Sequence, residues 1–90
     1  MYMPQQMNPQ VMPDPHTSVL VQGDVRNAIV PWTEELTLAR AIVAADYIGK
    51  WSPHSIAVIR NGRSQRISTT RLLHGDDMYL EPGDIVEIRR

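Results

Sequence analysis

The sequence predicts an α+β domain in which a small mixed sheet packs against one helix, preceded by a disordered N-terminal tail. Three observations predict this class. Apolar residues alternate in several short segments, whereas only one segment has the apolar period of a helix. An Asn-Gly pair, the strongest short-range hairpin signal, joins two of the alternating segments. Four of the seven prolines fall within residues 1–17, which separates this tail from one domain over residues 18–90.

The tail is rich in proline, methionine and glutamine. Each proline removes a backbone donor, so this stretch cannot lie in the interior of a helix or a sheet. We expect a disordered or polyproline-like spacer, although its four methionines could also dock on an apolar surface.

The domain begins with a predicted hairpin. Residues 28–30 form its second strand, which Pro31 ends, and the turn spans residues 24–27. The first strand contains Gly23 as a bend or bulge and has valines at odd spacings: Val19, Val21 and Val25.

One helix follows the hairpin. Its N-terminal cap is Thr33, with Glu34 and Glu35 behind it, or alternatively Thr37. Gly49 is expected to end the helix. Four residues at helical spacing form an apolar stripe that faces the core: Leu38, Ala41, Ile42 and Ala45.

A second hairpin is predicted after the helix. Its strands span residues 55–60 and 63–68, joined by Asn61-Gly62 in a type I′ turn. Residues 69–74 are then expected to form a single helical turn.

That helical turn is expected to place Leu72 and Leu73 in the core. Pro82-Gly83 fits the central positions of a type II turn, and residues 84–89 form the last strand. The resulting element order is that of a β-grasp fold, in which the last strand typically pairs in parallel with the first.

Composition and charge exclude several classes of protein. The absence of cysteine excludes disulfides, zinc thiolates, a thiol nucleophile and a lipidated cysteine. A net charge of -1 argues against nucleic acid as a partner. No apolar run is long enough to span a membrane, and the N-terminus lacks the pattern of a signal peptide. We expect a cytoplasmic chain, or an envelope-associated one if it is part of a longer protein.

The sequence predicts neither an enzyme nor a cofactor. The three histidines lack metal-ligand spacing, and no serine or threonine has the surroundings of a catalytic nucleophile. The only argument for calcium binding is the density of acidic residues over 76–84. We interpret these acids as solvated carboxylates of turns.

Charge is unevenly distributed near the C-terminus. The arginines and carboxylates of this region lie on ordinary solvated edges of the domain. In a sharper hypothesis they form a bipolar surface, whose basic side meets the acidic side of a neighbouring molecule. Trp51, like Trp32, either caps the core or stacks on a sugar or a partner. The candidate interaction residues are Arg60, Arg63, Arg66, Arg71, Asp76, Asp77, Glu81 and Trp51.

Four stretches occur in a specific order and spacing: VLVQGDVRNAIV, LTLARAIVAAD, IAVIRNG and HGDDMYLEPGDIVEI. Together they resemble the SLBB family, the soluble ligand-binding β-grasp domains, over residues 18–89. The family often has Gly-Gly at the end of the helix, where this chain has Ala45-Asp46-Tyr47. That change would alter a loop used for ligand or partner contact.

The resemblance implies a non-catalytic module for binding or assembly. SLBB domains occur in polysaccharide export proteins, in a respiratory oxidoreductase subunit and in cobalamin-binding carriers. The ending LxPGDxVxI makes polysaccharide export, or another envelope assembly, the leading setting. The expected partner is a protein or a second copy of the chain, with a carbohydrate or another soluble ligand as a further possibility.

Two other classes compete with this hypothesis. A ubiquitin-like sulfur carrier shares the β-grasp fold, but its chemistry needs a flexible C-terminal Gly-Gly, whereas this chain ends Ile88-Arg89-Arg90. A regulatory RNA-binding β-grasp domain has only the clustered arginines in its favour.

Overall fold

The computed structural model describes residues 16–50, 53 and 55–89, so most of the predicted tail lies outside the described residues. Strands and helices follow one another in the predicted order and at nearly the predicted positions. The elements are β1 (Ser18–Gln22), β2 (Ile29–Pro31), α1 (Leu38–Ala45), β3 (Ser55–Arg60), β4 (Arg63–Ser68), α2 (Thr69–Leu73) and β5 (Ile85–Arg89).

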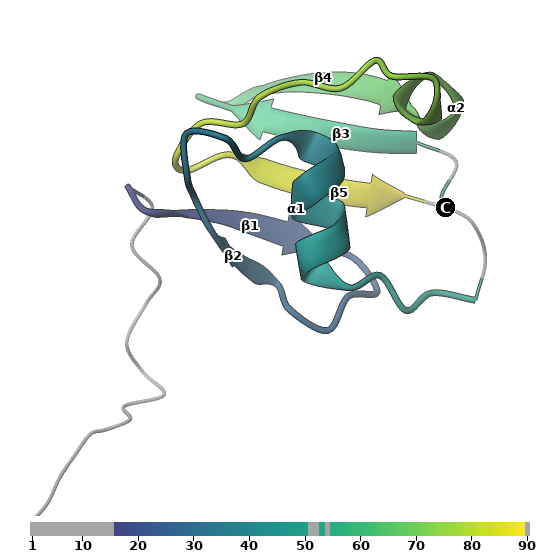
Figure 1. Cartoon of the computed structure of the whole chain (residues 1–90), viewed down its shortest axis with the longest axis horizontal. Helices are drawn as coiled ribbons and strands as arrows, with labels where there is room; N and C mark the ends of the chain where they lie inside the picture. Colours follow the sequence, from purple (N-terminus) through teal and green to yellow (C-terminus); the bar gives the residue numbers. More distant parts are fainter. Residues whose placement is uncertain (1–15, 51–52, 54, 90) are drawn as a thin grey trace, which may run out of the picture.

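The strands form one mixed sheet in the order β2-β1-β5-β3-β4, with α1 lying on one face (Figure 1). β5 is central, parallel to β1 and antiparallel to β3. The α+β class and the parallel pairing of the last strand with the first are therefore confirmed. β2 and β4 are the two edges of the sheet.

The first hairpin differs slightly from its prediction. β2 begins at Ile29, and Pro31 is its last residue rather than the residue that stops it. Pro31 stands opposite Ser18 on an edge strand, where a missing backbone donor is tolerated.

Thr37, not Thr33, caps α1. Its hydroxyl oxygen accepts a hydrogen bond from the backbone N–H of Arg40 at 3.3 Å. Glu34 and Glu35 therefore precede the helix in a turn instead of occupying its first turn.

The end of α1 contradicts the prediction that Gly49 terminates it. The helix ends at Ala45, because Asp46 adopts the left-handed conformation, with φ 61°, that glycine usually supplies at this position. Short polar side chains tolerate this region better than other non-glycine residues. The Asp46 carboxylate also lies 3.2 Å from the Arg26 guanidinium, in an exposed ion pair.

The β3–β4 hairpin is as predicted. Asn61 and Gly62 both have positive φ, 53° and 77°, which is the requirement of a two-residue type I′ turn. Arg60 and Arg63 are the closing pair of this hairpin.

The core lies between α1 and the sheet. Ile42 is only half-buried, at the edge of this core. Leu72 of α2 also packs against the core. Leu73 is 85% exposed, so its predicted burial is wrong: successive helical residues point about 100° apart and only one of them faces the sheet. The buried residues of the core are Val19, Val21, Val30, Leu36, Leu38, Ala41, Ala45, Ile56, Val58, Leu80 and Val86.

Neither helix in the described part of the chain has the length and apolar character needed to cross a membrane.

Candidate interaction surface

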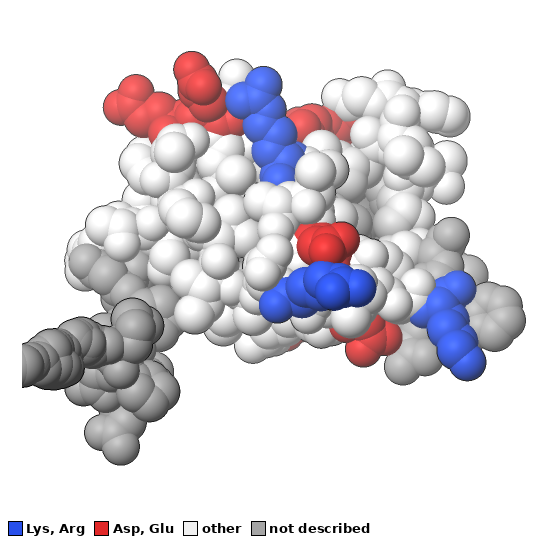
Figure 2. All heavy atoms as spheres, turned by 60° about the horizontal axis from the view of Figure 1, so that its bottom comes forward, with Lys and Arg blue, Asp and Glu red and all other residues white. Residues whose placement is uncertain are grey.

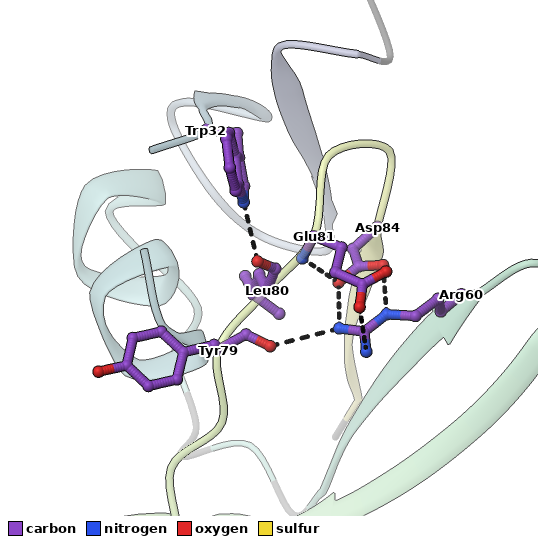
Figure 3. Close-up of polar contacts among 6 residues, drawn as sticks. All are labelled: Trp32, Arg60, Tyr79, Leu80, Glu81 and Asp84. Carbon is purple, nitrogen blue, oxygen red and sulfur yellow. Dashed lines mark hydrogen bonds and ion pairs between the residues drawn. The ribbon is translucent and has the colours of Figure 1, made fainter. Parts of the chain in front are cut away.

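Arg60 is bound to the turn that precedes β5. Its Nε and Nη2 donate to the carboxylate of Asp84 at 2.9 and 2.7 Å (Figure 3). Its Nη1 lies 3.3 Å from the exposed Glu81 carboxylate. Hydrogen bonding to Asp84 raises the pKa of the Arg60 guanidinium above its ordinary value, so this side chain is a fixed cation.

Asp84 is the anchor of this network. It is 1% exposed, which corrects its interpretation as a solvated turn carboxylate. Its side chain also accepts a hydrogen bond from the backbone N–H of Glu81 at 2.8 Å, while its own N–H donates to the Glu81 carbonyl at 3.1 Å. Gly83, with φ 89°, supplies the positive φ of the turn that these bonds close.

A sequence signal for the burial of Asp84 exists, although the sequence analysis did not use it. Asp84 has the same parity as Val86 and Ile88, which point to the inner face of β5. A charged residue in that phase needs a partner of opposite charge, and Arg60 has the inward parity on β3.

Trp32 connects the same loop to the first hairpin. Its indole Nε1 donates to the Leu80 carbonyl at 2.8 Å, and the ring is half-buried against the core (Figure 3). This position agrees with the core-packing interpretation of Trp32. Trp51, its counterpart in the sequence analysis, lies outside the described residues.

All three candidate acids have partners within the chain. Asp76 accepts a hydrogen bond from Arg71 Nε at 2.8 Å, in an exposed pair. Asp77 Oδ1 accepts from the backbone N–H groups of Ala39 at 3.0 Å and Met78 at 2.8 Å, which ties the loop to the start of α1. Glu81 likewise lies beside Arg60. These acids therefore do not form an acidic surface that is free to pair with a neighbouring molecule.

Arg63 and Arg66 differ from the other candidate arginines. Both are exposed, and neither side chain has a hydrogen bond or ion pair to any of residues 16–50, 53 or 55–89. Arg63 stands opposite Arg60, which points inward, whereas Arg66 stands opposite Ala57. Because successive strand residues alternate, Arg63 lies on the face that carries α1 and Arg66 lies on the outer face.

A groove follows β4 along the edge of the sheet, and Arg66 is among the residues that line it. It consists of two adjoining hollows, of about 560 and 200 Å³, which share Gln65 and Met78. The segment after α2 runs back along β4 (Figure 1) and supplies Asp76, Asp77 and Met78 to this groove. The larger hollow is lined by Val58, Arg60, Asn61, Arg63, Ser64, Gln65 and Met78.

The outer edge of β4 is open. The closing pair of a two-residue hairpin exchanges both backbone hydrogen bonds, so Arg63, Gln65 and Ile67 bond to β3. The backbone groups of Ser64 and Arg66 then face away from the sheet, and no other described segment bonds to them. β4 thus offers unpaired donors and acceptors between two arginines.

The outer face of the sheet carries an apolar row that the sequence analysis missed. Ile29, Leu20, Ile85 and Ile59 stand opposite one another across β2, β1, β5 and β3. Ile29 is 50% exposed and the other three are half-buried. Only the strand register brings them together, because they come from distant parts of the sequence.

The β2 side of the molecule is poor in charge. Figure 2 brings this side forward, and most of the visible surface there belongs to uncharged residues. β2 itself has the sequence IVP and no charged residue. The two edges of the sheet therefore differ in charge: β2 has no charged residue, whereas β4 has two arginines without a partner in the part of the chain that the structure describes.

No group of three histidine, aspartate or glutamate side chains within the described ranges is placed to hold a metal ion. In comparisons with known proteins, no family model matches the chain and no curated protein matches it.

Proposed function

We propose that this domain is a non-catalytic binding and assembly module with a β-grasp fold of the SLBB type, which holds a protein partner along β4. One observation carries the proposal: β4 is an exposed edge strand that combines an adjoining groove with backbone groups and two arginines that have no partner among the described residues. The sequence resemblance supports the family and suggests polysaccharide export, or another envelope assembly, as the setting.

The contrast between the two edges supports a binding role for β4. Natural sheets protect their edges with short strands, prolines, charges or covering segments. β2 is short and ends in Pro31. β4 spans Arg63–Ser68, contains no proline, and is not hydrogen-bonded along its outer edge by any other described segment. Of these devices β4 has only charge, from Arg63 and Arg66, and a partner of opposite charge neutralises it, so this edge favours the addition of an extended chain that carries such charge.

The proposal is tested by selecting binders from a display library of random twelve-residue peptides and mapping them on the ¹⁵N-labelled domain. We expect the amide chemical shifts of Ser64 to Ser68 and of Met78 to move most. Ser64→Pro should abolish binding, because proline removes a donor that faces the open edge. The fold of this variant is checked by the unchanged shifts of α1.

Arg26→Gln is the matched control, since Arg26 lies at the opposite side of the sheet beside Asp46. It should leave binding unchanged. Peptides that shift the apolar row of Ile29, Leu20, Ile85 and Ile59, and not β4, would contradict the proposed function.

A further inference from the structure

We infer that the partner of β4 is an acidic, extended segment of another protein, which adds to the sheet as an edge strand and places carboxylates on both faces. This inference rests on the proposed function and specifies its ligand. It follows from three features of β4: the backbone groups that face outward, the position of its two free arginines, and the groove beside it.

The backbone provides the first step. The N–H and C=O groups of Ser64 and Arg66 point away from β3, with no bond to another described segment. An extended peptide beside β4 would satisfy these groups in the pattern of a sheet ladder. A helix cannot do so, because its own backbone groups are already paired within the helix.

The arginines provide the second step. Arg63 and Arg66 stand three positions apart on opposite faces, so a partner strand meets both only if it carries carboxylates on both of its faces. Adjacent acidic residues meet this requirement. Guanidinium groups favour carboxylates because of their matching geometry.

The groove provides the third step. On the face that carries α1, a partner side chain beside Arg63 enters the larger hollow, where Val58 and Met78 offer apolar surface and Gln65 offers an amide. The exposed edge thus has room for side chains on its inner face.

A second copy of this chain fits β4 poorly. The other edge, β2, is three residues long and ends in Pro31, which donates no backbone hydrogen bond. Pairing β4 with β4 would bring Arg63 and Arg66 of both copies together, and like charges on facing strands repel. The candidate acids that could meet these arginines are instead bonded to Arg71, Arg60 and the start of α1.

The test uses a blocked peptide of sequence Thr-Val-Glu-Glu-Val-Glu-Glu-Thr as the probe, titrated into the domain at low salt. We expect the amides of Ser64 and Arg66 to shift and to become protected from hydrogen exchange. Replacing each glutamate with glutamine should abolish detectable binding. Arg63→Gln and Arg66→Gln should each weaken binding by up to about fivefold, the upper end of the range of an exposed ion pair.

Two controls separate strand addition from simple charge attraction. A probe with the same glutamates but N-methylated at every residue has no backbone donor on either edge and cannot form the ladder, so its affinity should fall to that of the glutamine peptide. Arg26→Gln, which removes a distant arginine, should bind the probe as the wild type does.

The inference is overturned if the glutamine peptide or the N-methylated probe binds as well as the original. It is also overturned if sedimentation shows that wild-type chains pair through β4, because the occupant is then a second copy. If the library instead yields neutral peptides that bind β4, the proposed function stands and the acidic partner is wrong. Peptides that bind elsewhere contradict both.

Discussion

The two halves of the sheet are built differently. The half formed by β2, β1 and β5 is covered by α1, and its inner face is completely apolar, with Val19, Val21 and Val86 at most 1% exposed. In the half formed by β3 and β4, the inner face of β4 carries Arg63 and Gln65 beside a groove, and only Ile67, near α2, packs against the core from this strand.

This difference separates stability from binding. Apolar burial stabilises the α1 half, at roughly 25 cal/mol per Å² removed from water. The outer strand of the other half has little to bury, and its first four residues are exposed. Substitutions in the α1 half should therefore lower the free energy of unfolding, whereas those on β4 should change binding alone.

The largest effect is expected for Leu38→Ala in the α1 half. Leu38 is 0% exposed under the sheet, so its truncation should lower the free energy of unfolding by about 2–5 kcal/mol, as measured by urea denaturation. Leu73→Ala is the matched control in α2, where the same change removes an exposed side chain and should cost less than about 0.5 kcal/mol. Equal losses would mean that the two regions are not packed as described.

The next largest effect is expected where the halves meet, at Arg60. Arg60→Met removes the partner of the buried Asp84 carboxylate and should lower the free energy of unfolding by about 3 kcal/mol. The loss should be no larger, because the Glu81 N–H still donates to Asp84. Thermal denaturation measures this change.

Adding Asp84→Asn to Arg60→Met provides the control. Without the buried charge, the double variant should recover part of the lost stability, and a double-mutant cycle gives the coupling between the two residues. A double variant that is less stable by the sum of both single losses would show that charge pairing is not what holds this turn.

The elements of the fold were predictable from local patterns, and the errors lie where several local solutions compete. The Asn61-Gly62 turn admits few alternatives, and β4 was predicted to the residue. The end of α1 was missed because Asp46, not the expected Gly49, takes the left-handed conformation, and the bonds from its N–H help to hold it there.

The candidate site was harder to predict because its charges pair across the chain. Four arginines close in sequence indicated a basic patch, but Arg60 and Arg71 bond to acids that are brought near by the β5 turn and the loop after α2. The position of the β5 turn beside β3 distinguishes Arg60 from Arg63 and Arg66, and the loop after α2 distinguishes Arg71 from them. The inward parity of Arg60 and Asp84 is a signal for their pairing, but Arg63 has the same parity as Arg60, so local sequence does not decide which of the two arginines reaches Asp84.

A smaller effect is expected for Trp32→Phe, at the border of the α1 half. The ring is kept, while the hydrogen bond from the indole to the Leu80 carbonyl is lost, which should cost about 1 kcal/mol. Equilibrium denaturation measures the difference. Trp32→Ala, which also removes the packing, should cost clearly more; equal losses would mean that the ring does not contribute.

The smallest effect is expected for the double variant Arg63→Gln/Arg66→Gln, which alters the other half without touching its core. Neither side chain has a partner in the described structure, so the free energy of unfolding should change by less than about 0.5 kcal/mol. Because Arg63 stands opposite Arg60 in the hairpin, any change at low salt should be a small gain, since like charges on facing strands repel. This gain should disappear near 1 M salt, where the screening length is only about 3 Å. A loss above about 1 kcal/mol would show that these arginines stabilise the fold, and the separation between a stabilising half and a binding half would fail.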